Sequence, residues 1–248
     1  QDARARSQVE NPVRLAVDGL ALVYHVMGEP GEHQLCLELG CDYLALFGAL
    51  KDYLEALTGA GIIPFVIVDG MQDKRKEATT LDRRRKQVKY SRPVLRVTAP
   101  GNPGRRKASS LLPLFAVETL AEACRSAGVS IRTALREADP DLAVACRPLP
   151  ADHKHASRDS KIPPGEGRRG YEERCAAVLS SDSDFIAMDV PGYIPLWSLA
   201  VGDNGSAGAL IFRRPLLAAR LGIPEDRMPD LACLLGNDWI QPNASVQR

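Results

Sequence analysis

The sequence predicts an α/β fold, a three-layer sandwich with a mostly parallel central sheet and helices on both of its faces. Short β-branched runs alternate along the chain with segments in which apolar residues recur every three or four positions. This alternation is typical of parallel sheets covered by helices. The 248 residues, of which 45% are hydrophobic, are enough for one large domain of this class or two small ones.

The first half of the chain contains two predicted buried strands separated by a helix. Residues 13–19 form a β-branched run that ends in Asp-Gly, which predicts a strand followed by a turn. Residues 41–61 place leucine and phenylalanine at helical spacing, and residues 62–70 form a second apolar run that ends in Asp-Gly. We expect the basic segment that follows to be helical from about residue 74 to residue 90.

The middle of the chain predicts a helix, a strand and another helix before a polar segment. The first helix is expected over residues 109–128, with Ser109 or Ser110 as its N-cap. Residues 129–146 predict a strand that leads into a helix. Residues 147–174 are dominated by Pro, Gly, Lys, Arg and Asp, and we expect a polar stretch of this length within a domain to be a mobile insertion.

Three short apolar runs and a helical pattern complete the prediction. Strands are expected over residues 176–181, 193–197 and 208–214, and a helix is expected over residues 228–240. The alternation of strand and helix patterns therefore continues toward the end of the chain, as a sheet with helices on both faces requires.

Composition and motifs argue against several classes of protein. No apolar run of 18 or more residues occurs, so no transmembrane helix is expected, and the polar start predicts no signal peptide. Neither a GxGxxG nor a GxxxxGK[ST] motif occurs, so we expect no nucleotide cofactor. The six cysteines lie at irregular spacings without a CxxC pair, which predicts buried free thiols in a reducing compartment.

Basic residues are concentrated in one segment, residues 73–107, which we call the basic arm. It contains 13 Lys or Arg and 3 Asp or Glu, a net charge of +10, whereas the rest of the chain has a net charge of −9. The basic arm could contact nucleic-acid phosphates through salt-dependent attraction, and a solvated helix face is the alternative interpretation. The candidate nucleic-acid-binding residues are Lys74, Arg75, Arg84, Arg85, Lys86 and Lys89.

Carboxylates follow the predicted strands at their carboxyl ends. Parallel strands bring these ends to one edge of the sheet, where the ligands of open α/β sheets bind. Each position also has a structural explanation, because Asp-Gly forms turns and aspartate caps helices. Four strand ends that all carry acid are harder to explain in this way. With one acid from a later helix, the seven candidates are Asp18, Asp69, Glu137, Asp139, Asp182, Asp184 and Asp238.

Clustered carboxylates repel one another, so protons or divalent cations must offset their charge. Mg²⁺ and Mn²⁺ prefer oxygen ligands. Two such ions about 3.5–4 Å apart can hold the attacking and leaving oxygens of a phosphodiester. We therefore expect the seven acidic residues to bind Mg²⁺ or Mn²⁺, as two ions, directly or through water.

Five motifs together resemble the asteroid proteins, which belong to the flap-endonuclease/XPG-like superfamily of PIN-domain nucleases. In chain order these motifs are LAVDGLALVYHV, PFVIVDGMQDKRKEATTLDRRR, READPDLA, VLSSDSDFIAMD and CLLGNDWI. The resemblance covers residues 13–240 and implies a single PIN-like domain over this range.

The resemblance also implies an activity and a cellular setting. Members of the superfamily are metal-dependent, structure-specific endonucleases, so we expect hydrolysis of phosphodiester bonds in single-stranded, overhang or flap DNA during DNA repair. The implied partner is DNA, single-stranded or branched, and no membrane is involved. The implied location is intracellular and nuclear.

The functional residues of the family map onto this chain. Every position of the acidic set holds a carboxylate, in the seven residues given above. In the superfamily a Lys and an Arg seven residues apart approach the scissile phosphate. Lys76 and Arg83 have that spacing, and as catalytic residues they would offset charge on the phosphate. The segment between Asp69 and the helix expected at 109–128 is short for a full threading arch, so the substrate preference of flap endonucleases is not carried over.

Two other functions fit parts of the pattern. A catalytically inactive relative could keep the fold as a scaffold that binds nucleic acid or protein partners in signalling, although such relatives usually have gaps in the acidic set. A phosphatase with Asp18 as its nucleophile would usually need a second aspartate two residues later, where this chain has Leu20.

Overall fold

The computed structural model describes the chain in five main stretches, residues 12–28, 41–71, 112–147, 174–202 and 204–235. Between the second and third stretches it also describes Leu81, Asp82, Arg85 and Lys89, all of them helical and exposed. The predicted helix of the basic arm is therefore described at these four positions alone. No helix among the described residues is long and apolar enough to cross a membrane.

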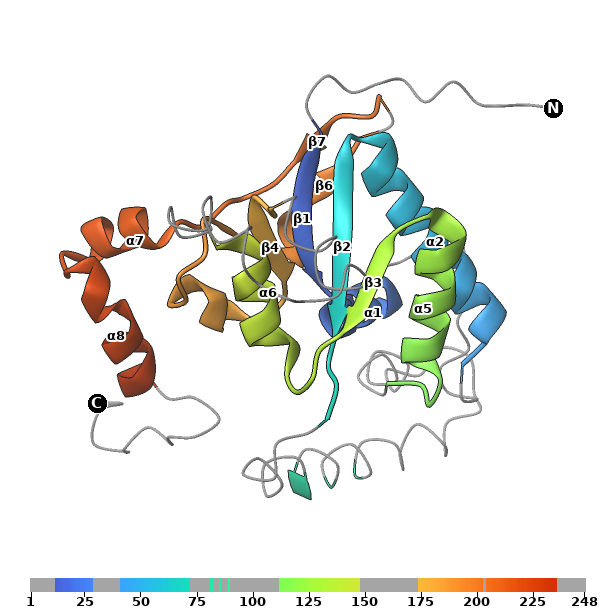
Figure 1. Cartoon of the computed structure of the whole chain (residues 1–248), viewed down its shortest axis with the longest axis horizontal. Helices are drawn as coiled ribbons and strands as arrows, with labels where there is room; N and C mark the ends of the chain where they lie inside the picture. Colours follow the sequence, from blue (N-terminus) through green and yellow to red (C-terminus); the bar gives the residue numbers. More distant parts are fainter. Residues whose placement is uncertain are drawn as a thin grey trace, which may run out of the picture.

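A five-stranded parallel sheet forms the centre of the molecule, with strand order β3-β2-β1-β4-β5. Figure 1 shows β1 between β2 and β4, so the first strand of the chain lies in the middle of the sheet. The fold class that the sequence predicts is thereby confirmed. The strands are β1 (Val13–Asp18), β2 (Ile62–Val68), β3 (Ser130–Thr133), β4 (Ala177–Ser180) and β5 (Tyr193–Pro195).

The sheet is buried on both faces, because successive residues of a strand point to opposite sides. In β1, Leu15 and Val17 pack into one hydrophobic cluster, whereas Ala16 packs into the other. In β4, Leu179 and Val178 divide between the two clusters in the same way. Strands buried on both faces read as continuous apolar runs, which is the pattern that identified them in the sequence.

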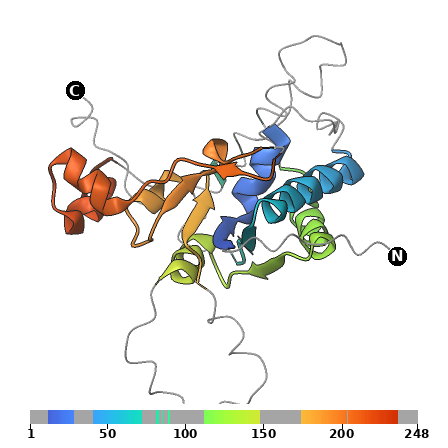
Figure 2. The same cartoon turned by 90° about the horizontal axis from the view of Figure 1, so that it is seen from above.

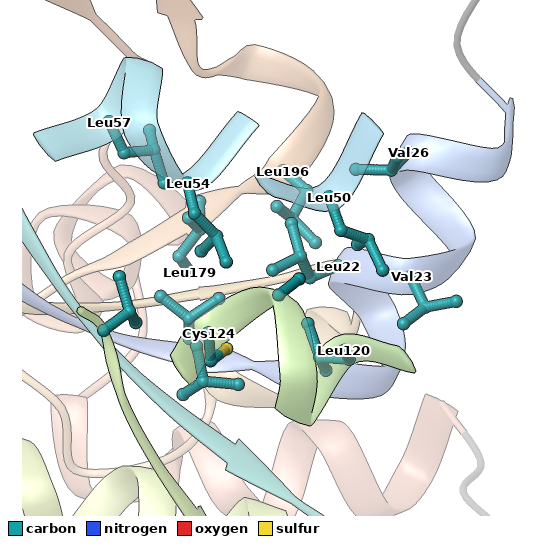
Figure 3. Packing of buried hydrophobic residues seen from close by; sticks show 14 of the residues in the cluster. Leu22, Val23, Val26, Leu50, Leu54, Leu57, Leu120, Cys124, Leu179 and Leu196 are labelled. Atoms are coloured by element: carbon teal, nitrogen blue, oxygen red, sulfur yellow. The ribbon is translucent and has the colours of Figure 1, made fainter. Parts of the chain in front are cut away.

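Three helices cover one face of the sheet and form the larger of the two clusters. They are α1 (Gly19–Gly28), α2 (Tyr43–Gly59) and α5 (Ala116–Ala127). Figure 3 shows Leu22 of α1, Leu54 of α2 and Leu120 of α5 converging above Leu179 of the sheet. Asp42 is the N-cap of α2, and its Oδ1 accepts hydrogen bonds of 3.0 Å from the backbone N–H groups of residues 44 and 45.

One helix, α6 (Ala138–Cys146), packs against the opposite face. Figure 2 shows α6 on the side of the sheet away from α2 and α5. Its Leu142 and Cys146 pack in the smaller cluster with Phe185 from η4 (Ser183–Ile186), the short helix that follows β4. Helices therefore lie on both faces, which completes the predicted three-layer sandwich.

The described chain after β5 begins beside the sheet and ends in two helices that lie to one side of the sandwich (Figure 1). It contains two α-helices that do not belong to either cluster covering the sheet. The first of them, α7, was not among the sequence predictions. A short antiparallel hairpin, β6 with β7, precedes them. The elements of this part are η5 (Leu196–Ser198), β6 (Ala200–Val201), β7 (Ala207–Gly208), α7 (Arg214–Leu221), η6 (Glu225–Arg227) and α8 (Met228–Leu235).

Three of the sequence predictions are wrong in detail. The turn expected after Asp18 is instead the start of α1, since Gly19 is its first residue. A Cβ at Gly19 would lie 2.5 Å from Val68 Cγ1, so the glycine allows close packing of this helix on the sheet. Of the strand expected over residues 208–214, Gly208 ends β7 and Phe212 makes one isolated antiparallel bridge with Tyr193.

The helix expected from residue 109 begins at Ala116, and its N-cap position is Phe115, which makes no side-chain capping bond. Because Phe115 is the N-cap, the serine cap expected for this helix is wrong, and Ser109 and Ser110 themselves lie outside the described residues. Pro113 accounts for the late start, because the residue before a proline is disfavoured in the helical conformation.

Candidate functional site

The carboxyl ends of β1, β2 and β4 meet at one edge of the sheet. The parallel register pairs Asp18 with Ile67 and Val17 with Leu179. Ser180 is therefore level with the end of β1, and Asp69 lies two residues beyond it. This register brings acids that are far apart in the sequence to the same edge of the sheet.

Asp18 is the most enclosed of these acids. Its Oδ1 accepts a 3.0 Å hydrogen bond from the Ala21 N–H in the first turn of α1, and its Oδ2 accepts a 2.8 Å hydrogen bond from the Ser180 hydroxyl. Burial raises the pKa of Asp18 above its ordinary value. The two hydrogen bonds oppose that rise, and the charge of Asp69 adds to it. The side chain is thus fixed in orientation by both of its oxygens.

Asp69 fixes the start of α6 at the same edge. Its Oδ1 accepts a 2.7 Å hydrogen bond from the Ala138 N–H, the first residue of that helix. The next residue, Gly70, donates its N–H to the Arg136 carbonyl at 2.6 Å. These bonds bring the segment carrying Glu137 and the first turn of α6 against the end of β2.

Asp139, in that first turn, interacts electrostatically with acids from three other strand ends. The pKa of Asp139 is raised to about 7, first by burial and then by the negative charges of Asp182, Asp18, Asp69 and Glu137, in that order. These charge effects link the five carboxyl groups electrostatically at this edge of the sheet. We call this set, Asp18, Asp69, Glu137, Asp139 and Asp182, the acidic cluster.

Ser180 links two members of the acidic cluster and was not among the predicted site residues. It is fully buried at the end of β4, where its hydroxyl donates to Asp18 and accepts a 3.0 Å hydrogen bond from the Asp182 N–H. A polar residue at the end of an apolar strand, directly before an Asp-rich segment, was a signal for it in the sequence. Buried hydroxyls need such partners.

Asp182 and Asp184 differ in their surroundings. Asp182 Oδ1 accepts a 2.9 Å hydrogen bond from the Asp184 N–H and so caps η4, which bears out the structural interpretation of this residue. The same side chain raises the pKa of Asp139. Both residues are exposed, but Asp184 is not among the carboxylates that raise that pKa. Five of the seven predicted acids therefore interact electrostatically at this edge of the sheet.

Several predicted site residues lie outside the described part of the chain. These are Asp238, the proposed catalytic pair Lys76 and Arg83, and the basic residues Lys74, Arg75, Arg84 and Lys86. Of the predicted nucleic-acid-binding residues, the structure describes Arg85 and Lys89, which are both exposed on a helix.

Four members of the acidic cluster differ in their pairing from other acids of the described chain. Other acids nearby are paired, for example Asp141 with Arg132 at 2.9 Å and Asp189 with Arg214 at 3.2 Å. No ion pair of this kind joins a described basic residue to Asp18, Asp69, Asp139 or Asp182. In the described stretches, no three His, Cys, Asp or Glu side chains converge closely enough to hold a metal ion without rearrangement.

The chain is similar in sequence to three kinds of curated protein, and no protein-family model matches it. It is 26% identical to the human constitutive coactivator of peroxisome proliferator-activated receptor gamma, over 81% of the chain and 19% of that protein. It is 29% identical to protein asteroid of Drosophila melanogaster, over 65% of the chain and 15% of that protein. It is 23% identical to the single-strand DNA endonuclease ASTE1 of Danio rerio, over 93% of the chain and 30% of that protein.

The fold is similar to solved structures at low sequence identity. The catalytic core of Rad2 in complex with DNA substrate superposes with a TM-score of 0.55 at 15% identity, covering 94% of this chain and 58% of that one. Human GEN1 in complex with Holliday junction DNA superposes with a TM-score of 0.54 at 12% identity, covering 96% of this chain and 48% of that one. The chain spans less than a third of the length of the curated relatives that it matches.

Proposed function

We propose that this chain, an asteroid-family member of the XPG-like superfamily, is a metal-dependent, structure-specific DNA endonuclease. The proposed reaction is hydrolysis of phosphodiester bonds in single-stranded, overhang or flap DNA, in the service of DNA repair in the nucleus. Support comes from the similarity to a single-strand DNA endonuclease and from the fold shared with the Rad2 catalytic core.

One observation carries the proposal, namely that acids from four strand ends meet in the acidic cluster. Asp18 ends β1, and Asp69, Asp139 and Asp182 follow β2, β3 and β4 respectively. The charges of the other three influence the ionisation of Asp139. A folded protein gains no stability from like charges held together, since each raises the cost of ionising the others. Such an arrangement is typical of a site that binds a cation and reacts with an anion.

The donor set fits Mg²⁺ or Mn²⁺ in its chemistry. All five ligand candidates are carboxylates, and hard divalent ions prefer oxygen ligands. Burial is the first cause of the raised pKa of Asp139, and four neighbouring negative charges add to it; a divalent ion would offset those charges. When bound, such ions would act as Lewis acids at a phosphate and would lower the pKa of a bound water molecule toward neutral pH.

The residues of this chain have distinct proposed roles around that cation. Asp18 is held by Ala21 and Ser180, so it presents a fixed ligand direction. Asp69 holds the start of α6, which keeps Asp139 at the same edge. Asp184 and Asp238 complete the proposed ligand set. Lys76 and Arg83 are proposed to offset charge on the scissile phosphate, and the rest of the basic arm to hold the DNA backbone.

Substitution of Asp182 tests the proposal directly. We expect Asp182→Ala to abolish Mg²⁺- or Mn²⁺-dependent cleavage of labelled single-stranded and overhang DNA while DNA binding is largely kept. Asp182→Asn keeps an oxygen acceptor for the Asp184 N–H, so it removes the charge without removing the cap of η4. We expect the same loss of cleavage, by about 10²-fold or more, from both variants.

A matched control comes from one helix. Asp139 belongs to the acidic cluster, whereas Asp141 on the same helix is paired with Arg132 outside it. Asp139→Asn is expected to lose cleavage and Asp141→Asn to keep it. Undiminished turnover by Asp182→Asn or Asp139→Asn, or full activity in chelator, would show that the cluster is not a catalytic metal site.

The scaffold function is the second candidate, and one comparison favours it. The human relative at 26% identity is named as a coactivator of a nuclear receptor. In that case the chain would bind nucleic acid or a protein partner without cleaving DNA. Binding of labelled DNA with no cleavage of single-stranded, overhang, flap or junction substrates in Mn²⁺ would favour the scaffold over the endonuclease.

A further inference from the structure

Two cysteines at the base of the polar segment lie side by side. Cys146 is the last residue of α6, and Cys175 precedes β4 by one residue. The backbone N–H of Cys175 donates a 3.1 Å hydrogen bond to the carbonyl of Ala145, so the end of α6 and the segment before β4 lie side by side at this point. The 28 residues between the two cysteines thus leave and re-enter the domain at one place.

The two thiols also belong to the same buried hydrophobic cluster, and their acidities differ. The Cys146 thiol hydrogen-bonds the Cys175 sulfur, which lowers the pKa of Cys175, and the positive charge of Arg14 lowers it further against the opposing effect of burial. The same hydrogen bond, followed by burial, raises the pKa of Cys146. One sulfur is therefore favoured as a thiolate while its neighbour keeps the proton, as in nucleophile and resolving pairs.

Both sulfurs are buried but lie close to the surface. Cys146 and Cys175 are 2% and 3% exposed. Arg147, Arg174 and Ala176, which flank them in the chain, are exposed. Cys124 provides a contrast within the same fold, because burial raises its pKa to about 12 and it packs in the larger hydrophobic cluster.

We propose that Cys146 and Cys175 form a peroxide-sensitive dithiol that is oxidised to a reversible disulfide between the end of α6 and the start of β4. The Cys175 thiolate attacks hydrogen peroxide, which forms a sulfenic acid and releases hydroxide. The Cys146 sulfur then attacks the sulfenic sulfur, and its proton leaves with the displaced oxygen as water. In total two thiols are oxidised to one disulfide, and one peroxide is reduced to two waters.

The disulfide would join the far ends of two elements that carry the acidic cluster. On α6, Asp139 lies in the first turn and Cys146 is the last residue. On β4, Cys175 lies before the first residue and Asp182 follows the last. Oxidation would therefore fix α6 to β4 without touching a carboxylate. The disulfide can be detected without a cleavage assay, so this proposal is tested independently of the endonuclease proposal.

The experiment is peroxide oxidation of the full chain, followed by alkylation of free thiols and peptide mapping. We expect hydrogen peroxide to yield a cross-linked peptide pair that contains Cys146 and Cys175 and that dithiothreitol separates. Cys124 serves as the internal reference. Loss of free thiol at Cys175 is expected to be at least about tenfold faster than at Cys124, since each unit by which a thiol pKa is lower gives a tenfold larger thiolate fraction.

Two variants separate the attacking and the resolving sulfur. Cys146→Ser is expected to leave a sulfenic acid on Cys175 that dimedone traps, whereas Cys175→Ser is expected to give neither the disulfide nor the dimedone adduct at Cys146. Circular dichroism checks that each variant folds. If a variant does not fold, the peptide map of the oxidised, unsubstituted chain still tests whether the disulfide forms. Equal protection of Cys124, Cys146 and Cys175 from peroxide, or a cross-link between any other pair, would overturn the proposal.

Discussion

Asp139 shows how its surroundings set the chemistry of a single residue in this molecule. Asp141 lies two positions further along the same helix and pairs with Arg132, whereas burial and four neighbouring acids raise the pKa of Asp139 to about 7. Spacing in the sequence cannot distinguish these two aspartates, because the difference arises from which strand ends face them. The sequence did identify Asp139 as a candidate, through its place after the third predicted strand.

The stability of the chain in chelator is expected to depend on pH through Asp139. Its folded pKa of about 7 lies above the ordinary value of 3.8, so the favourable contribution of its neutral form is complete below pH 3.8 and is lost as the pH rises through 7. Asp139→Asn is always neutral and should lose less stability over this range. Urea unfolding at a series of pH values measures the difference.

Identical pH dependence in the variant and the unsubstituted chain would contradict the expected role of Asp139. Part of the dependence should persist in Asp139→Asn, because burial also raises the pKa of Asp18. Asp141→Asn is the matched control, and its free energy of unfolding should follow that of the unsubstituted chain across the range.

Ser180 was missed by the sequence analysis for a physical reason. A serine at a strand end has many ordinary explanations, and only the folded sheet shows that its hydroxyl lies between Asp18 and the backbone of Asp182. By contrast, Asp18 and Asp69 were predictable because parallel strands must place their carboxyl ends together. The roles of Lys76, Arg83 and Asp238 stay predictions, since these residues lie outside the described structure.

At the scale of elements, the docking of α6 depends on close backbone contact after β2. Gly70 donates its N–H to Arg136, and a Cβ at position 70 would overlap the carbonyl oxygen of Ala134. The overlap is with backbone, which cannot move aside as the end of a flexible side chain can. The Asp-Gly pair therefore has a role here beyond turn formation, which was the role that its sequence suggested.

Gly70→Ala is accordingly expected to displace the start of α6 and to lower the free energy of unfolding by about 1–3 kcal/mol. Gly59→Ala is the control, because nothing lies within 4 Å of a Cβ at that position. The control should change stability by less than about 1 kcal/mol, in the stabilising direction. Denaturant unfolding of the two variants provides the comparison, and equal stabilities would rule out a tight contact at Gly70.

Element types were predictable from the sequence more accurately than element boundaries. Strands β1 and β2 and helix α2 match their predicted ranges because each has a strong apolar pattern. The start of α5 was placed too early, since Pro113 outweighs the favourable serines before it. The strand predicted near residue 212 contributes one bridge at the edge beside β5, where few partners are available.

At the scale of the whole molecule, stability rests on two hydrophobic layers of different size. The larger cluster joins α1, α2 and α5 to the sheet, and the smaller one joins α6 and η4 to the opposite face. Figure 3 shows how side chains from all three helices of the larger cluster converge on the strands. Both layers follow from continuous apolar runs in the sequence, which is why the fold class could be predicted.

Leu120→Ala tests the larger layer. Leu120 is fully buried between α5 and the sheet, whereas Leu114, just before the same helix, is 82% exposed. We expect Leu120→Ala to lower the free energy of unfolding by about 2–5 kcal/mol and Leu114→Ala to change it by less than about 0.5 kcal/mol. Urea denaturation measures both, and a small effect at Leu120 would contradict the packing described here.

Helix α6 has the acidic cluster at its start and the attachment of the polar segment at its end. The helix starts at the edge where Asp69 holds Ala138 and ends at Cys146, beside the residue that precedes β4. The stretch from 148 to 173 is therefore attached at the opposite end of the layer from the carboxylates. Evolution can lengthen, shorten or rewrite that stretch without altering the spacing of Asp139 and Asp182, so sequence divergence there need not imply divergence in chemistry.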